Sequence, residues 1–268
     1  MTDLLPKEGS ASDLMRGFGF LFRAISVIFT TPKLLALSLL CALVTAITLF
    51  AIGSGSWSLG QGLAEKWIGA DGGWRHAASL GLGFVFFAVF FAVGALTIPN
   101  LILSPLQDPI SEATEVKLGN FVAPPFTVAG TITGILSSLR HTLARLLLMA
   151  LGYLVLFPLN LIPVAGSVIY VVLSSLWAMF WLAVEHLSNP MARHLRPFRQ
   201  VIGVMRKRIA LSLGFGAALY VLLWVPVLNC FLMPIAVVAG TLLYRALADV
   251  NAFPPNGNED PSRVLGVP

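Results

Sequence analysis

A short run of hydrogen-bond donors precedes the first long apolar stretch of the chain. Thr30 and Thr31 supply hydroxyls, Pro32 is a residue that commonly opens a helix, and Lys33 adds a positive charge. The first N–H groups of a helix have no acceptor within it, and they favour a negative charge nearby. Such groups together can replace the water shell of a small anion, so we interpret Thr30, Thr31 and Lys33 as a candidate binding point. The alternative is that Lys33 only flanks a membrane span on its inner side.

Three carboxylates with helical spacing invite a second interpretation. Asp108, Glu112 and Glu115 resemble a metal or acid–base set, but a solvated helix face at the inner membrane surface explains them as well, and we favour that face. The chain contains no H-E-x-x-H, no G-x-S-x-G, no Cys/His metal spacing and no phosphate loop. We therefore expect no enzyme activity, no cofactor and no metal site.

Polar residues are sparse inside the apolar stretches. Asn100, Asn160 and Asn229 are the candidates for lining a pore, together with scattered Ser and Thr. These stretches hold no Asp, Glu or His of the kind that builds a proton relay. A channel-like or gradient-driven route therefore fits the sequence better than a proton-coupled pump.

The elements that would position these residues are membrane helices. Charged residues are absent from 34–52, 81–99, 146–184 and 209–244, and 57% of the 268 residues are hydrophobic while 11% are charged. A water-soluble domain cannot bury so much apolar surface. The sequence predicts an all-α polytopic membrane protein whose partner is the lipid bilayer.

The N-terminal half contains an interfacial helix and two long transmembrane helices. Residues 13–29 place their large apolar side chains on one helical face, with two interior arginines off it, which is typical of a helix lying in the membrane interface. The spans are predicted at 34–52 and 80–99. The second is expected to end near Pro99 and to be followed by a short amphipathic helix over 104–119.

Two Pro-turned helical hairpins, 143–184 and 209–247, complete a single membrane domain over 13–250. Each expected turn, 158–163 and 226–234, reads Pro, then Asn, then Pro, without a charge. Uncharged turns after short arms favour hairpins that are only partly inserted, and two full spans with tight outer turns are the alternative. The ends of the chain, 1–12 and 251–268, are predicted to be disordered.

The distribution of cations predicts the orientation. Of 17 Lys and Arg, only Lys66 and Arg75 lie in the loop between the two long spans. Placing both termini in the cytoplasm leaves all the others inside, as the positive-inside rule requires. The net charge of +5 then reflects topology, and nucleic-acid binding is not needed to explain it.

An ordered set of short motifs resembles the family of the CysZ-type sulfate permeases and the etoposide-induced membrane proteins. The resemblance runs from about residue 14 to residue 248. It is carried by Ser104-Pro105 through Glu112, Ile162-Pro163 with Gly166, Asn189-Pro190, His194, Pro197-Phe198, Arg206-Lys207-Arg208, Phe215-Gly216, Pro226, Asn229, Met233-Pro234 and Ala239-Gly240-Thr241.

The resemblance implies a bacterial inner-membrane protein that forms oligomers and takes up sulfate. In the sulfate permeases, sulfate contact is associated with a Gly-hydrophobic-Arg-Arg run directly after the proline that opens the first span. Here Pro32 is followed by Lys33-Leu34-Leu35-Ala36, without the two arginines. The Asp-Tyr-Pro of the family is Ser188-Asn189-Pro190 in this chain.

Two functions from different classes follow. One is a permease or channel-like protein for a small oxyanion, with sulfate as the first candidate. The other is a membrane scaffold or membrane-shaping protein that transports nothing, which the missing arginine pair and the short hairpins favour. A continuous polar path past Asn160 or Asn229 would distinguish the first from the second.

Overall fold

The computed structural model describes Leu5 and residues 12–69, 72–119, 128–162, 165–223 and 226–253, and all regular structure in these residues is helical. Five of their helices are long and apolar enough to cross a membrane, in agreement with an all-α polytopic membrane protein. The predicted disordered ends lie almost wholly outside the described residues. The elements are α1 (Asp13–Thr30), α2 (Pro32–Ile68), α3 (Gly73–Lys117), α4 (Val128–Leu156), η1 (Phe157–Leu161), α5 (Ala165–Arg193), α6 (Phe198–Lys207), α7 (Ile209–Leu223) and α8 (Pro226–Asp249).

The chain divides into two compact units. Residues 39–106 form the first, here called the hairpin unit. Residues 1–38 and 107–268 form the second, here called the core unit. The division falls within α2 and within α3, so each of these helices contributes to both units.

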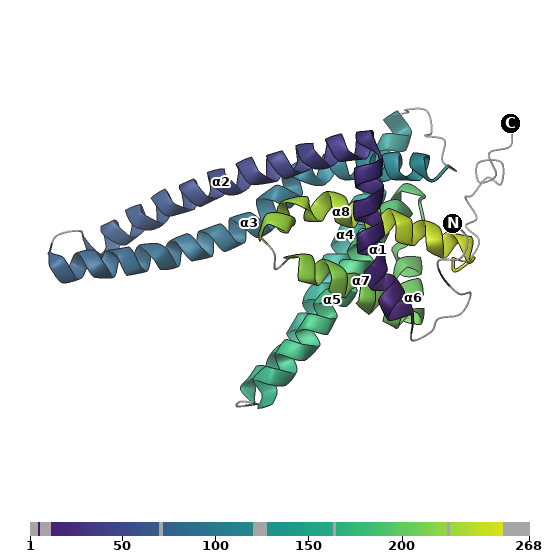
Figure 1. The fold of residues 1–268 in the computed structure, drawn as a ribbon. Coiled ribbons are helices and arrows are strands. Elements are labelled where there is room, and N and C mark those ends of the chain that lie inside the picture. The colour runs from purple at the N-terminus through teal and green to yellow at the C-terminus, as the bar shows by residue number, and fades with distance from the viewer. Residues whose placement is uncertain are drawn as a thin grey trace. The chain divides into compact units, whose positions relative to one another are not determined.

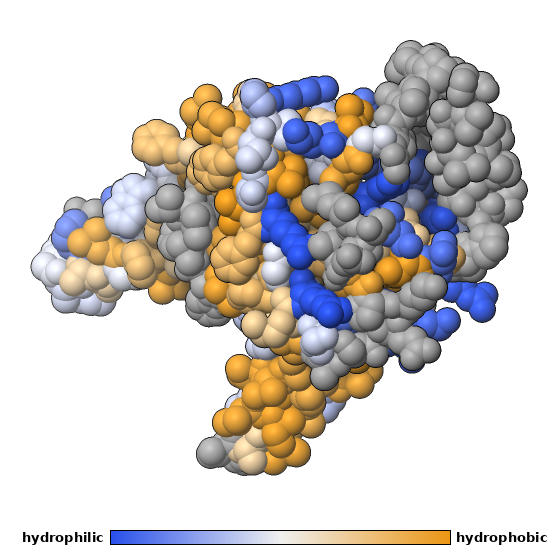
Figure 2. Space-filling view, turned by 45° about the vertical axis from the view of Figure 1, so that its right-hand side comes forward, coloured by the Kyte–Doolittle hydropathy of each residue, from blue (hydrophilic) through white to orange (hydrophobic). Residues whose placement is uncertain are grey.

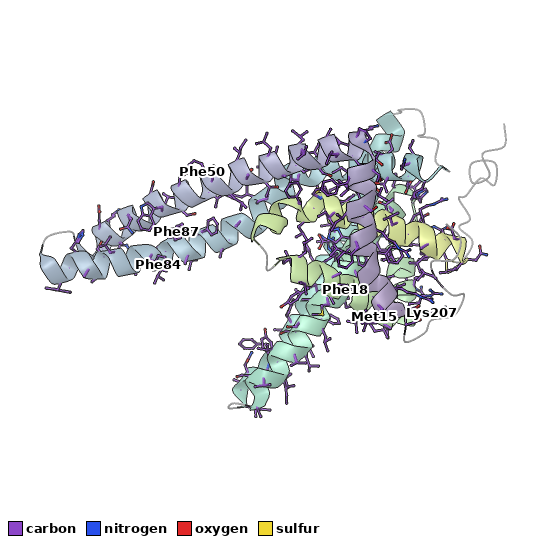
Figure 3. The ribbon with its side chains drawn as sticks, viewed as in Figure 1. Met15, Phe18, Phe50, Phe84, Phe87 and Lys207 are labelled. Atoms are coloured by element: carbon purple, nitrogen blue, oxygen red, sulfur yellow. The ribbon has the colours of Figure 1, made fainter. Side chains whose placement is uncertain are left out.

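In the hairpin unit, α2 and α3 run side by side in opposite directions (Figure 1). Aromatic rings join them edge to face, with centroids 5.7 Å apart for Trp57 and Phe87 and 5.5 Å apart for Trp67 and Phe86. Gly60 lies directly against the α3 backbone, where a Cβ would stand 2.7 Å from a carbonyl oxygen. Small residues at such contacts are how membrane helices approach closely. Phe50 and Phe84 are more than half exposed, as a lipid-facing surface requires (Figure 3).

The α3 helix does not end near Pro99, where the sequence suggested a break. It continues through Pro99, Pro105 and Pro109 to Lys117, so the amphipathic helix expected over 104–119 is the end of α3. A proline removes one N–H from the ladder and strains the preceding turn. Neighbouring groups can satisfy the freed carbonyls in a membrane protein, and the helix then persists.

The core unit is built around α8. Within the window of α8 that is apolar enough to span, 78% of the residues are buried, which is far more than in the other candidate spans. α1, α5 and α7 each contact α8, and α7 also contacts α1 and α5. Backbones meet at glycines on three interfaces: Gly214 of α7 lies against the Leu14 carbonyl, Gly216 against that of Met179, and Gly240 against that of His186.

The helix expected over 13–29 is present as α1, but only some of its apolar side chains are buried, and others are exposed. Phe20 and Ala24 are buried, whereas Met15, Phe22 and Phe29 are 61–71% exposed. Met15 and Phe18 can be located in Figure 3. α1 therefore covers α7 and α8 with one side and leaves large apolar side chains on another, and its place in the membrane interface remains a prediction.

The two predicted hairpins correspond to α4–η1–α5 and α7–α8. The arms of the first are longer than expected, because residues 139–161 and α5 each have the length and hydropathy of a full span. In the second, the turn expected at 226–234 is wrong, because these residues are not a loop but the first turns of α8. With 15 residues, α7 is only about 22 Å long, which is shorter than a bilayer core. How deeply either hairpin enters the membrane remains a prediction.

Candidate functional site

The head of α2 is the part of the core unit that contains the predicted anion-binding residues. α2 begins at Pro32, as the sequence suggests, and Thr31 is the single residue between α1 and α2. Its backbone is extended (φ −123°, ψ 104°), and its carbonyl accepts a hydrogen bond of 2.9 Å from the Leu35 N–H. Thr31 therefore occupies the N-cap position of α2.

The Thr31 side chain does not cap the helix, although threonine at this position usually does. A capping hydroxyl accepts a hydrogen bond from the second or third N–H of its helix. Here the Thr31 Oγ1 is buried and has no partner among the described residues. The N–H groups of Lys33 and Leu34 have no acceptor within α2 either, because of their place in its first turn. The Lys33 side chain is exposed. A hydroxyl without a partner among the described residues, two N–H groups without an acceptor in α2, and a cation thus meet at one helix end.

A second unpaired hydroxyl lies two turns further along α2. Ser38 is 1% exposed, and its Oγ has no partner among the described residues. Seven residues from Thr31, it lies on nearly the same side of the helix and about 10 Å along its axis. Ser38 is not among the residues predicted to bind the anion, and its spacing of seven from Thr31 is the one sequence signal that points to it.

Thr30 is placed differently from the other two predicted residues. It is the last residue of α1, and its hydroxyl donates to backbone carbonyls of its own helix, at 2.8 Å to Ser26 and 3.2 Å to Val27. A hydroxyl has one hydrogen, so the Thr30 side chain presents acceptor lone pairs and no free donor. The structure brings Thr31 and Lys33 to the head of α2 and directs the hydroxyl of Thr30 into α1.

The three asparagines proposed as pore lining are far apart in the sequence, and only one side chain is described. Asn160 lies in η1, at the tip of the α4–α5 hairpin, and is exposed. Asn100 lies in α3 and Asn229 in the first turn of α8, and their side chains are outside the described residues. Among the residues that the structure describes, no group of three or more His, Cys, Asp or Glu could hold a metal ion.

The interpretation of the α3 carboxylates as a solvated face is wrong for Glu115. Asp108 is exposed, but Glu115 is 2% exposed and lies between two residues at the end of α5. Its Oε1 is 3.3 Å from the His194 Nε2, and its Oε2 is 3.8 Å from the Arg193 guanidinium. Arg193 also reaches Asp108, at 3.4 Å. Glu115 therefore joins the end of α3 to the end of α5.

Aromatic stacking extends this polar cluster to α8. The His194 ring stacks on Tyr244 with centroids 5.0 Å apart, and Tyr244 stacks on Phe253 at 5.4 Å. The Arg196 guanidinium lies 4.9 Å from the Phe253 ring centroid. Nearby, the hydroxyls of Ser111 and Thr241 are 2.8 Å apart and buried. These contacts pack the ends of α3 and α5 against α8.

A second buried ion pair holds the start of α1. Asp13 is 1% exposed, and its carboxylate is 3.8 Å from the guanidinium of Arg208, itself 6% exposed, between α6 and α7. Arg16, on the next turn of α1, approaches Asp13 to 3.8 Å as well. Arg208 is therefore part of the core, whereas Arg206 and Lys207 on the same basic run are exposed.

Comparison of the sequence with known proteins identifies a family. Residues 20–234 match the family described as sulfate transporter CysZ/etoposide-induced protein 2.4. Proteins named sulfate transporter CysZ match from Pseudomonas syringae (30% identical; 63% of this chain and 66% of that protein), Pseudomonas fluorescens (31%; 58% and 62%) and Salmonella typhimurium (27%; 59% and 61%). The matched stretch spans less than two thirds of each relative's length. Because the family match covers most of the sequence, this chain belongs to the sulfate transporter CysZ/etoposide-induced protein family.

Proposed function

We propose that this chain is a multi-pass permease of the bacterial inner membrane that carries sulfate, and that it binds the anion at the head of α2. The observation that carries the proposal is the buried Thr31 hydroxyl without a partner among the described residues. It stands at a helix start whose first N–H groups have no acceptor within the helix, beside the exposed Lys33 ammonium. Buried donors are almost always paired in proteins, so a buried donor left unpaired at a helix start suits a ligand that supplies acceptors. The family membership supports the same reading.

Each group has a separate role in this proposal. The N–H groups and the N-terminal end of the α2 dipole hold two of the sulfate oxygens. The Thr31 hydroxyl donates to a third oxygen. The Lys33 ammonium donates a charge-assisted hydrogen bond that compensates for part of the water shell that the dianion loses. Ser38 offers the next donor along the same side of α2, about 10 Å onward. Thr30 contributes by ending α1 and not by donating to the anion.

Lys33 is the one side-chain cation in the first turns of α2, where the resembling permeases have two arginines. In place of the two arginines of that pattern, α2 has Leu35, which is half-buried, and Ala36, which is exposed. One side-chain cation and the helix dipole then face a doubly charged anion. We therefore expect weak binding and a route driven by the sulfate gradient. We also propose that the protein works as a homo-oligomer with both termini in the cytoplasm.

The direct test is uptake of radiolabelled sulfate into liposomes that carry the purified full chain, with thiosulfate, phosphate and chloride as competitors. Lys33→Gln should weaken sulfate binding by about 1–3 kcal/mol, the scale of one charge-assisted hydrogen bond. Thr31→Val should weaken it by about 1 kcal/mol, since one neutral donor is lost. Lys117→Gln is the matched control, because Lys117 is an exposed cation at the end of α3.

A variant that is expected to bind sulfate more strongly complements the two that are expected to bind it more weakly. Leu35→Arg with Ala36→Arg restores two cations in the first turns of α2 and should strengthen sulfate binding. If Lys33→Gln and Lys117→Gln behave alike, Lys33 is only a topology signal and the head of α2 is not the site. If the unmodified protein moves none of the four anions, the scaffold function replaces the permease.

A further inference from the structure

A groove of about 800 Å³ opens on the core unit between α4, α5, α6 and α7. Its wall follows α4 from Leu148 to Leu156, which is about 12 Å along the helix axis. Leu151 and Val155 are 55% and 69% exposed there, and Leu176 of α5 is 42% exposed. Figure 2 shows the hydrophobic surface on the projecting part of α4 and α5. A surface of this kind is suited to hydrocarbon.

One charged residue lines the groove. Arg206 of α6 is exposed, and no acidic partner for it occurs in the part of the chain that the structure describes. The opposite side of α6 is fixed in the core through Val201, Val204 and Met205, all buried. The helix therefore holds a guanidinium against an apolar groove. Lys207 follows it at the C-terminal end of α6 (Figure 3).

One residue that lines the groove also carries a buried donor without an acceptor among the described residues. Trp181 is 4% exposed and lines the groove, and its Nε1 has no hydrogen-bond partner among the described residues. The neighbouring Trp177, by contrast, donates to the Met149 carbonyl at 3.2 Å. A tryptophan N–H that is buried usually has an acceptor. An occupant of the groove should therefore carry oxygen atoms near Trp181 as well as hydrocarbon.

We propose that this groove is a specific site for an anionic phospholipid of the surrounding bilayer. An acyl chain lies along α4 and α5, a glycerol-ester carbonyl accepts from the Trp181 N–H, and the phosphate pairs with Arg206. The groove thus combines an apolar wall, a residue with a buried donor and an exposed cation, which correspond to the tail, ester and headgroup of a phospholipid. The inference does not rest on sulfate transport, and lipid binding is measured without any sulfate.

The test is native mass spectrometry of the purified, delipidated full chain titrated with lipids of identical acyl chains. Phosphatidylglycerol should bind more tightly than phosphatidylcholine. Arg206→Gln should lower the affinity for phosphatidylglycerol about fivefold, which is the contribution of one cation near an anionic lipid. Arg199→Gln is the control, since Arg199 is exposed on the same helix but does not line the groove, and it should leave the affinity unchanged.

Two further variants test the groove without changing its charge. Trp181→Phe keeps an aromatic ring and removes the donor, and it should weaken both lipids about fivefold through the lost hydrogen bond. Leu151→Trp fills the apolar channel and should weaken both lipids more strongly. Size-exclusion chromatography confirms that each variant stays folded.

Three results would overturn the proposal. Equal losses of affinity for phosphatidylglycerol in Arg206→Gln and Arg199→Gln would mean that the phosphate is attracted by the general surface charge and not by a specific residue. Unchanged lipid binding by Leu151→Trp would place the lipid elsewhere. Crosslinking through a cysteine at position 151 between two copies, together with no lipid bound to the unmodified chain, would show that a second copy occupies the groove.

Discussion

The substitution Glu115→Gln tests whether Glu115 is buried, as in the structure, or solvated, as the sequence pattern suggests. The change keeps the shape of the side chain and removes one negative charge. If Asp108, Glu112 and Glu115 formed one solvated face, neutralising any of them would have the same small effect. In the structure Glu115 is 2% exposed and Asp108 is 76% exposed in its side chain, so the two should differ.

The expected loss of stability depends on the two residues that lose their partner, Arg193 and His194. Removing one member of a fully buried ion pair costs about 3–5 kcal/mol, because the other charge stays uncompensated. Here the side chains of Arg193 and His194 keep 17% and 28% exposure, and the contacts of 3.8 and 3.3 Å are long, so part of that cost is relieved by water. We expect Glu115→Gln to lower the free energy of unfolding by about 2–3 kcal/mol. Asp108→Asn breaks an exposed pair and should cost about 0–1 kcal/mol.

The assay is unfolding of the purified chain in mixed micelles by SDS, followed by tryptophan fluorescence and circular dichroism. Glu115→Gln, Asp108→Asn and Glu112→Gln are compared, and each carries the same loss of charge. The double variant Glu115→Gln with His194→Gln then isolates the contact at 3.3 Å, and the two changes should be non-additive. If all three single variants lose the same small amount of stability, Glu115 is solvated and the packing of α3 on α5 described above is incorrect.

Three further predictions concern packing, charge and topology. Gly214→Ala should destabilise the α1–α7 interface by about 1–3 kcal/mol, because the new methyl group meets the Leu14 carbonyl. Gly19→Ala, whose Cβ meets nothing within 4 Å, should be neutral or slightly stabilising in the same unfolding assay, and a reversed order would contradict this interface. Asp13→Asn and Arg208→Met should each destabilise, and the double variant should cost at least about 1 kcal/mol less than their sum; simple additivity would exclude the pair at 3.8 Å. In a chain with Cys41 and Cys230 replaced by Ala, a cysteine at position 199 should not react with an impermeant maleimide in intact cells, and labelling from outside would invert the topology.

The sequence by itself was sufficient for the features that depend on local composition. Charge-free stretches identified the membrane helices, because lipid excludes charged groups whatever the fold. Pro32 predicted the start of α2, because its missing N–H is harmless in a first turn. The periodicity of 13–29 predicted α1, because the spacing of apolar residues alone shows that they can share one side of a helix.

Tertiary structure decided which of those residues have partners. Periodicity gives the same face to Asp108 and Glu115, and only the end of α5 buries one of them. A proline predicts a break equally at Pro99 and at Pro226, yet α3 continues through the first and α8 begins at the second, because neighbouring groups and not the ring alone decide whether a helix persists. The unpaired hydroxyls of Thr31 and Ser38 and the donor of Trp181 are likewise invisible in the sequence, since an unmet hydrogen bond is a property of the surroundings of an atom.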